Sequence, residues 1–110
     1  MQVLTFKKFV TQDFKKLAKK AFDNIFDLVE KKYQDFDIDY EEDNLIIEVN
    51  NLTFVLSIHN PMSQIWLSSP ISGAHHFELK KENEEYVWMN TRDESIFLFE
   101  KLENELKTLL

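Results

Sequence analysis

Polar and apolar residues alternate along residues 64–68, in the pattern of a half-buried β-strand. Ile65 and Leu67 are predicted to face the core of the protein. Gln64 and Trp66 then face the opposite side, so the widest aromatic ring of the segment stands on a polar strand face. Because tryptophan combines a large contact area with a polar N–H group, such a position is typical of a partner-binding surface.

The same alternation predicts further strands before and after this segment. Asn50 and Asn51 form a predicted two-residue hairpin turn between two of them, because asparagine tolerates positive φ. The short links between strands indicate antiparallel neighbours. The predicted strands are residues 35–40, 45–49, 52–59, 64–68, 74–80 and 86–90.

Several polar or ring-bearing residues are predicted to share the outer strand face with the tryptophan. His75 and His76 are neighbours on one strand and therefore point to opposite faces, so we do not expect both to bind one metal ion. Only His76 falls on the outer face. The candidate partner-binding residues on that face are Ser57, His59, Gln64, Trp66 and His76.

Two amphipathic helices enclose the strands in the sequence. The first is predicted over residues 11–33, with Thr11 as its N-cap and Asp13 in its first turn. The second follows Asp93 or Ser95 as its cap and continues to the C-terminus. The apolar stripe of the first helix is Phe14, Leu17, Ala18, Ala21, Phe22, Ile25, Leu28 and Val29, and that of the second is Leu98, Leu102, Leu106 and Leu109.

Each helix has a single apolar stripe, so both are predicted to cover the same face of the sheet. The fold class is therefore an α+β two-layer sandwich, with about six mainly antiparallel strands and one face left open. Residues 11–110 form the predicted domain. Residues 1–10 form a predicted N-terminal tail, which is either a frayed end or a remnant of an organelle-targeting segment.

The charge of the chain excludes some classes of partner. Its 110 residues carry a net charge of −7, which argues against binding to a nucleic-acid backbone. Residues 23–50 hold ten acidic residues and two lysines, so cations or a basic protein surface are the expected partners of this part. The chain has no cysteine for a thiolate metal site. No apolar run approaches the roughly 18 residues that a membrane-spanning helix needs.

Acidic residues recur on one face of the first helix and on the outer face of the first strand. If this strand is an edge strand beside the helix, the two rows form one acidic ridge. The ridge is either a weak cation site with oxygen ligands only, suited to iron, Ca²⁺ or Mn²⁺, or a solvated face that keeps the edge strand from pairing with other chains. The candidate metal-binding residues are Asp23, Asp27, Glu30, Asp37, Asp39, Glu41, Glu42 and Asp43.

The ten residues from Gln64 to Gly73 read Gln-Ile-Trp-Leu-Ser-Ser-Pro-Ile-Ser-Gly and resemble the signature of the frataxin family. The order of elements resembles that family over residues 12–110. The resemblance implies weak binding of iron, Fe²⁺ or Fe³⁺, on the acidic ridge. It also implies docking to a cysteine desulfurase and to the scaffold protein of iron–sulfur cluster assembly. The implied location is a mitochondrion or a mitochondrion-derived organelle, or alternatively a bacterial cytoplasm.

The chain departs from the family pattern at three places. Relatives are usually acid-rich early in the first helix, whereas this chain has lysines there. Ser57 stands where an asparagine is common, and His76 stands where many eukaryotic relatives have an arginine. The lysines in the matching turns of the first helix are Lys15, Lys16, Lys19 and Lys20. The departure on the helix shifts the expected weight of iron binding to the acidic residues from Asp37 to Asp43.

No Ser/His/Asp or Cys/His arrangement and no phosphate-binding glycine loop is recognisable in the sequence. The first hypothesis is therefore a non-catalytic regulator, monomeric when free, that modulates the desulfurase–scaffold complex. A second hypothesis is a ferroxidase or iron-storage enzyme, an activity attributed to some relatives in the family. A third is a protein-interaction domain without any function in iron metabolism.

Overall fold

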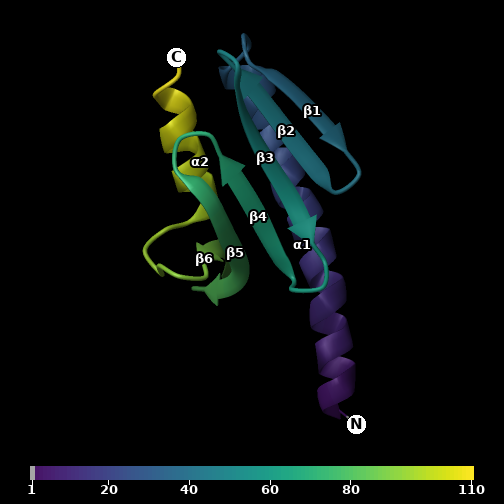
Figure 1. The fold of residues 1–110 in the computed structure, drawn as a ribbon. Coiled ribbons are helices and arrows are strands. Elements are labelled where there is room, and N and C mark those ends of the chain that lie inside the picture. The colour runs from purple at the N-terminus through teal and green to yellow at the C-terminus, as the bar shows by residue number, and fades with distance from the viewer. Residues whose placement is uncertain (1) are drawn as a thin grey trace.

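The computed structural model describes the backbone of residues 2–110 and the side chains of residues 14–110. Six antiparallel strands form one open sheet in the order β1-β2-β3-β4-β5-β6, with one helix before it and one after it. Both helices lie on the same face of the sheet (Figure 1), which confirms the predicted α+β sandwich. The elements are α1 (Gln2–Lys32), β1 (Asp37–Glu41), β2 (Asn44–Val49), β3 (Leu52–His59), β4 (Gln64–Ser69), β5 (Gly73–Glu82), β6 (Glu85–Asn90) and α2 (Leu98–Lys107).

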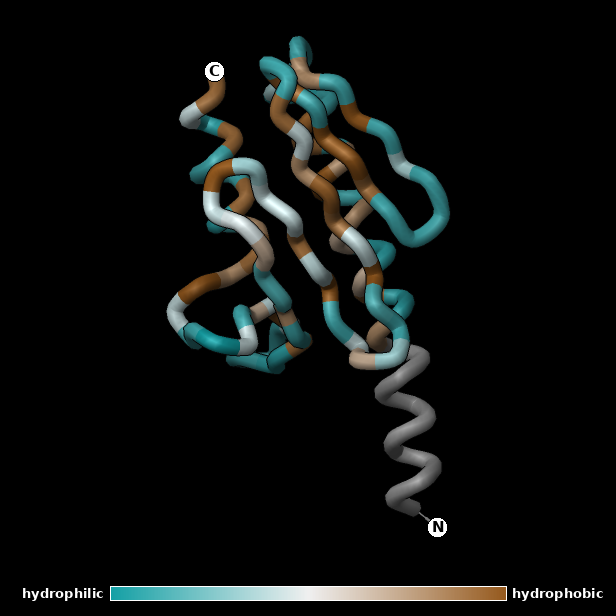
Figure 2. Tube along the Cα trace, viewed as in Figure 1, coloured by the Kyte–Doolittle hydropathy of each residue, from teal (hydrophilic) through white to brown (hydrophobic). Residues whose placement is uncertain are grey.

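A single hydrophobic core fills the space between the helices and the sheet. Phe22 and Ile25 of α1, Phe54 and Ile65 of the sheet, and Leu102 of α2 are all almost completely buried in it. Hydrophobic and hydrophilic residues alternate along the strands, so only one face of the sheet contributes to this core (Figure 2). Each such side chain contributes roughly 1.5–3 kcal/mol through its burial. The opposite face of the sheet is left without a covering layer.

The first helix begins earlier than the sequence predicts. It starts at Gln2, nine residues before the predicted N-cap, so the prediction that Thr11 caps the helix is wrong. Residues 2–10 contain neither glycine nor proline, and several of them favour helices, so nothing interrupts the helix at Thr11. The side chains of Thr11 and Asp13 lie outside the described side chains. The division into a tail of residues 1–10 and a domain of residues 11–110 stays a prediction.

The second helix begins later than expected. Its N-cap is Phe97, which makes no side-chain capping bond, so the predicted cap at Asp93 or Ser95 is wrong. Asp93 instead accepts hydrogen bonds from the backbone N–H and the hydroxyl of Ser95. Phe97 pairs with Met89 as an isolated β-bridge, which holds its backbone extended and delays the helix until Leu98.

The connections between strands are short and rely on left-handed backbone conformations. Asn50 and Asn51 have φ of 52° and 65°, so the predicted two-residue turn is confirmed. Gly73, the only glycine of the chain, has φ of 88° where β5 begins. No helix among the described residues is both long enough and apolar enough to cross a membrane.

Candidate docking face and acidic ridge

Three aromatic rings are stacked on the open face of the sheet. The Trp66 ring lies between His59 and His76, with ring centroids 3.8 Å and 4.3 Å apart and interplanar angles of 10° and 8°. The three rings come from β3, β4 and β5, which are neighbours in the sheet. In the strand register Trp66 lies opposite His76, and His59 lies opposite Gln64. The outward position of Trp66 is the one that strand alternation predicts.

Hydrogen bonds hold the polar neighbours of this ring stack in place. The Trp66 Nε1–H group donates to Gln64 Oε1 at 2.8 Å, so the amide of Gln64 fixes the direction of the indole. The Ser57 hydroxyl donates to Asn44 Oδ1 at 2.8 Å. All five candidate partner-binding residues therefore share the open face. Whether they contact a partner stays a prediction.

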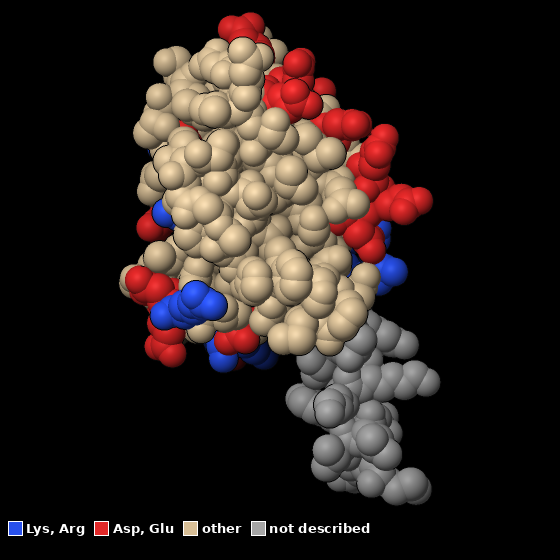
Figure 3. Space-filling model, in the orientation of Figure 1, with Lys and Arg blue, Asp and Glu red and all other residues tan. Residues whose placement is uncertain are grey.

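The centre of the open face is nearly free of charge, whereas its β1 side is acidic. Figure 3 shows Asp and Glu side chains gathered along the β1 side of the molecule, next to a broad surface of other residues. Met62, just before β4, and Ile71, just after it, are 58% and 49% exposed. Both residues belong to the turns that flank β4.

The structure brings part of the predicted acidic ridge together. A shallow hollow of about 570 Å³ lies between α1 and β1, and Asp23, Asp27 and Asp39 line it beside three apolar or aromatic residues. One of these, Phe26, packs against Tyr40 of β1 with ring centroids 6.4 Å apart. The other predicted acidic residues do not line this hollow. They are Glu30, Asp37, Glu41, Glu42 and Asp43.

Asp43 differs from the rest of the ridge because it has partners. Its carboxylate forms an ion pair with Lys19 at 3.3 Å and accepts a hydrogen bond from the Asn60 amide at 3.2 Å. Lys19 is one of the lysines that distinguish the first helix of this chain. The pairing neutralises one end of the ridge, whereas none of its other seven carboxylates forms an ion pair among the described side chains.

The carboxylates of the ridge suit iron chemically but do not form a closed site. Within the part of the chain whose side chains are described, no three acidic or histidine residues lie close enough to hold a metal ion. Burial raises the pKa of the Tyr40 hydroxyl, and the nearby Asp23 raises it further, so this phenol stays protonated at neutral pH. The donor set at the hollow is therefore carboxylate oxygen, which fits weak, solvent-exposed binding of iron.

A buried carboxylate fastens the turn after β4 to α2, and the sequence analysis missed it. Glu105 of α2 is only 7% exposed, and its two oxygens accept hydrogen bonds from the hydroxyls of Ser69 and Ser72. Lys101 completes the group with an ion pair at 3.1 Å. The Ser69 oxygen in turn accepts from the backbone N–H groups of Ile71 and Ser72. The serines of the Ser-Ser-Pro-Ile-Ser segment thus serve to anchor the turn.

The hydrogen bonds around Ser72 do not run in the directions that a nucleophilic triad requires. Ser72 donates its single hydrogen to Glu105, so at the 2.8 Å contact between Ser72 Oγ and His75 Nε2 the imidazole must be the donor. His75 Nδ1 is then an acceptor facing the Asn90 amide at 3.5 Å. In a catalytic triad the carboxylate orients the histidine, and the histidine takes the proton of the serine. This cluster therefore ties β5 and β6 to the turn without activating Ser72.

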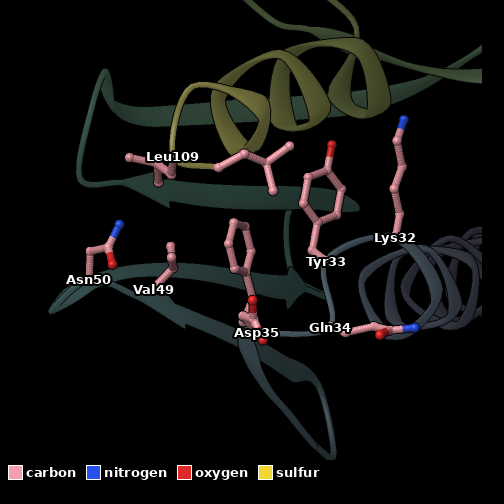
Figure 4. A pocket seen from close by; sticks show the side chains of 9 residues that line it. Lys32, Tyr33, Gln34, Asp35, Val49, Asn50 and Leu109 are labelled. Atoms are coloured by element: carbon pink, nitrogen blue, oxygen red, sulfur yellow. The ribbon is translucent and has the colours of Figure 1, made fainter.

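A second hollow, of about 540 Å³, lies where the end of α1, the β2–β3 turn and the end of the chain meet (Figure 4). Tyr33 extends from the end of α1 towards α2 and stacks on Phe36, with ring centroids 5.1 Å apart. Burial raises the pKa of its hydroxyl, which has no hydrogen-bond partner among the described residues. None of the candidate site residues lines this hollow.

Fold and surface together define a small α+β sandwich that carries an uncovered, ring-bearing sheet face beside an acidic edge. Comparison with known proteins identifies the protein family to which this chain belongs. A family model described as a frataxin-like domain matches residues 7–110, and the chain belongs to the frataxin-like family. The family expected from residues 64–73 is thereby confirmed.

Curated relatives agree with this assignment. Frataxin of Arabidopsis thaliana is 31% identical over 104 residues, which cover 89% of this chain and 54% of that protein. The frataxin homologue of Schizosaccharomyces pombe is 33% identical over 90 residues, which cover 81% of this chain and 54% of that protein. A frataxin-like protein of Leishmania donovani is 36% identical over 101 residues, which cover 82% of this chain and 53% of that protein.

The chain spans about half the length of these relatives. All three are named as mitochondrial proteins, in agreement with the mitochondrial location expected from the sequence.

Proposed function

We propose that this protein is a regulator of iron–sulfur cluster assembly that docks on a complex of a cysteine desulfurase and a scaffold protein and modulates sulfur transfer. The observation that carries this proposal is the uncovered sheet face, on which Trp66 lies between His59 and His76. A large aromatic side chain that is held rigidly on an exposed face supplies the kind of anchor that dominates protein interfaces. Membership of the frataxin-like family supports the same role.

The two surfaces have different chemistry, which supports two different contacts. The nearly uncharged face around Trp66 suits the scaffold protein. The acidic ridge suits a basic surface of the desulfurase, because opposite charges speed the encounter and orient the partners. Since the two surfaces adjoin, one bound protein can bridge both components of the complex.

The acidic ridge is also the proposed site of weak iron binding, at the hollow between α1 and β1. Replacing Asp23, Asp27 and Asp39 together with asparagine is expected to weaken Fe²⁺ binding by at least about tenfold, because the ligands of this hard cation are carboxylate oxygens. The fold should be retained, since all three side chains are exposed. Calorimetric titration with Fe²⁺ without oxygen measures the effect.

The matched control removes the same charge at a distance from the ridge. Glu82, Glu85 and Glu94 are exposed acidic residues on or after the last strands, and their triple replacement with glutamine should leave Fe²⁺ binding unchanged. Equal Fe²⁺ binding by both triple variants would show that the ridge is not the iron-binding site. Oxidation of Fe²⁺ over many turnovers, faster than in buffer, would instead favour the ferroxidase hypothesis.

A further inference from the structure

We propose that the docking face recognises uncharged carbonyl oxygens of its partner, to which Gln64 and His59 donate hydrogen bonds, and that the indole of Trp66 positions the Gln64 amide for this contact. The inference rests on the proposed function and names the chemical groups of the partner that the open face binds. The directions of the hydrogen bonds around the indole and the charges beside them support it.

The indole determines which end of the Gln64 amide is free. The Trp66 Nε1–H group lies 2.8 Å from Gln64 Oε1. An indole nitrogen can only donate, so the amide atom that faces it must be the oxygen. The NH₂ end of this amide forms no hydrogen bond with the described residues and is not among their buried, unpaired polar atoms. Its N–H groups are therefore available to a partner.

The indole can hold the amide in this orientation because its own ring is held. The rings of His59 and His76 lie on its two sides and nearly parallel to it, with centroids 3.8 Å and 4.3 Å away. Rotation of the indole out of its plane would break both stacking contacts. Trp66 is therefore a positioning residue for Gln64, in addition to offering its own outer edge to the partner.

His59 supplies a second donor because one of its two ring nitrogens is buried. Its Nδ1 atom is buried and has no hydrogen-bond partner among the described residues. An N–H group buried without an acceptor is more costly than an unpaired lone pair, so the neutral ring carries its proton on Nε2. The charged ring has a proton on Nε2 as well, so this donor does not depend on the charge of His59. Nε2 is not among the buried, unpaired atoms, and the side chain is half-exposed.

The two donors lie side by side on the sheet. His59 and Gln64 are opposite each other in the register of β3 and β4, so their side chains leave the sheet about 5 Å apart. The neighbouring Ser57 hydroxyl already donates its hydrogen to Asn44 Oδ1 and is not available to a partner in the same way. Exposed main chain of a partner, with carbonyl oxygens at a similar spacing, would satisfy both donors.

The charges around the two donors favour an uncharged acceptor over a carboxylate. Glu78 lies opposite Gln64 in the register of β4 and β5, and its pairing with Lys80 at 3.4 Å occupies the nearby cation. Arg92 lies on the β6 side, where it lines a hollow of about 380 Å³ together with His76. The β1 side of the molecule is acidic (Figure 3), and the net charge is −7. A carboxylate would approach against this field, whereas a carbonyl group would not.

Two substitutions of Gln64 separate donation to a partner from support of the indole. Q64E keeps an oxygen for the Trp66 N–H group but has no hydrogen to donate, whereas Q64K has hydrogens to donate but cannot accept from the indole. Binding to a recombinant desulfurase–scaffold complex is measured by biolayer interferometry at about 0.05 M and about 0.5 M salt. Q64E should bind about 10- to 100-fold more weakly than the natural protein at both salt concentrations, because a partner acceptor is left unpaired. Q64K should lose less than about fivefold.

A matched control separates the loss of the donor from the added negative charge. Ser68 is exposed on the same strand, so S68E adds the charge without removing a donor, and it should lose less than about threefold at high salt. NMR of the free proteins shows whether the variants fold and whether the indole N–H signal of Q64E keeps its natural position. The ¹⁵N signals of His59 in the natural protein should show the proton on Nε2.

Three results would overturn the inference. Natural affinity in Q64E together with a loss in Q64K would show that Gln64 only supports the indole. Tighter binding by Q64K than by the natural protein, confined to low salt, would identify the partner group as a carboxylate. A neutral His59 with its proton on Nδ1 would remove the second donor. Failure of the natural protein to bind the complex at all would instead contradict the docking proposal itself.

Discussion

Replacing Trp66 with alanine is expected to weaken binding to the desulfurase–scaffold complex by at least about 100-fold, because truncation of a central tryptophan anchor removes several kcal/mol from an interface. The same change should lower the free energy of unfolding by only about 1 kcal/mol. The ring lies outside the core, and the fold loses only its stacking on two histidines and one hydrogen bond to Gln64. Binding is measured by interferometry and stability by denaturant unfolding.

Tyr86 provides a matched control for this substitution. It is another exposed aromatic residue, 49% exposed on β6, and it lies outside the ring stack. Its replacement with alanine should leave binding within about twofold of the natural protein, as expected for a residue outside the interface. A Trp66 variant that unfolds, or one that binds as tightly as the Tyr86 variant, would contradict the assignment of the docking face.

Replacing Glu105 with alanine is expected to destabilise the fold by about 3 kcal/mol, since it leaves buried hydrogen-bonding groups without partners. Glu105 accepts hydrogen bonds from Ser69 and Ser72, and it forms an ion pair with Lys101. Without it, the turn after β4 is no longer fastened to α2. Denaturant unfolding of the natural protein and the variant measures the difference.

Glu103 on the same helix is the control, because its carboxylate pairs with Lys32 at the surface at 3.1 Å. Its replacement with alanine should cost less than about 1 kcal/mol, as is usual for exposed ion pairs. Equal losses of stability in the Glu103 and Glu105 variants would contradict the anchoring role of Glu105.

The stabilisation by Glu105 should also depend on pH. Burial raises the pKa of its carboxyl, but the hydrogen bonds from Ser69 and Ser72 and the contact with Lys101 outweigh this effect and hold the pKa below its ordinary value of 4.5. A group whose pKa is lowered by folding contributes stability above its unfolded pKa and loses it as the pH falls through the folded value. The stability difference between the natural protein and the Glu105 variant should therefore be full at neutral pH and shrink in acid. A difference that does not change with pH would contradict this explanation.

The fold and the orientation of Trp66 could be predicted because they depend on short-range periodicity. Alternation over residues 64–68 is enough to place Ile65 in the core and Trp66 on the outer face. The stacking of His59 and His76 on the indole could not be predicted. The stacking depends on the register between three strands and on the side-chain conformations, and a local sequence pattern determines neither of these.

The anchoring role of Glu105 was missed for a related reason. Ser69 and Glu105 are 36 residues apart in the sequence, and a glutamate on a helix with a clean apolar stripe reads as a solvent-exposed residue. The predicted starts of the two helices were wrong in opposite directions. No helix-breaking residue lies between Gln2 and Thr11, so the first helix begins before the predicted cap. The second helix begins late because Phe97 pairs with Met89 in a β-bridge. In both cases a distant contact or the absence of a breaker outweighed a favourable capping residue.

Titration of the isotope-labelled protein with the desulfurase–scaffold complex, followed by NMR, tests the proposed docking face most directly. The indole N–H signal of Trp66 and the signals of His59, Gln64 and His76 should shift or broaden first, together with those of the acidic edge at β1. Signals of α2, on the opposite side of the sheet, should change least. Perturbation centred on α2, with the Trp66 signal unchanged, would show that the partner binds elsewhere.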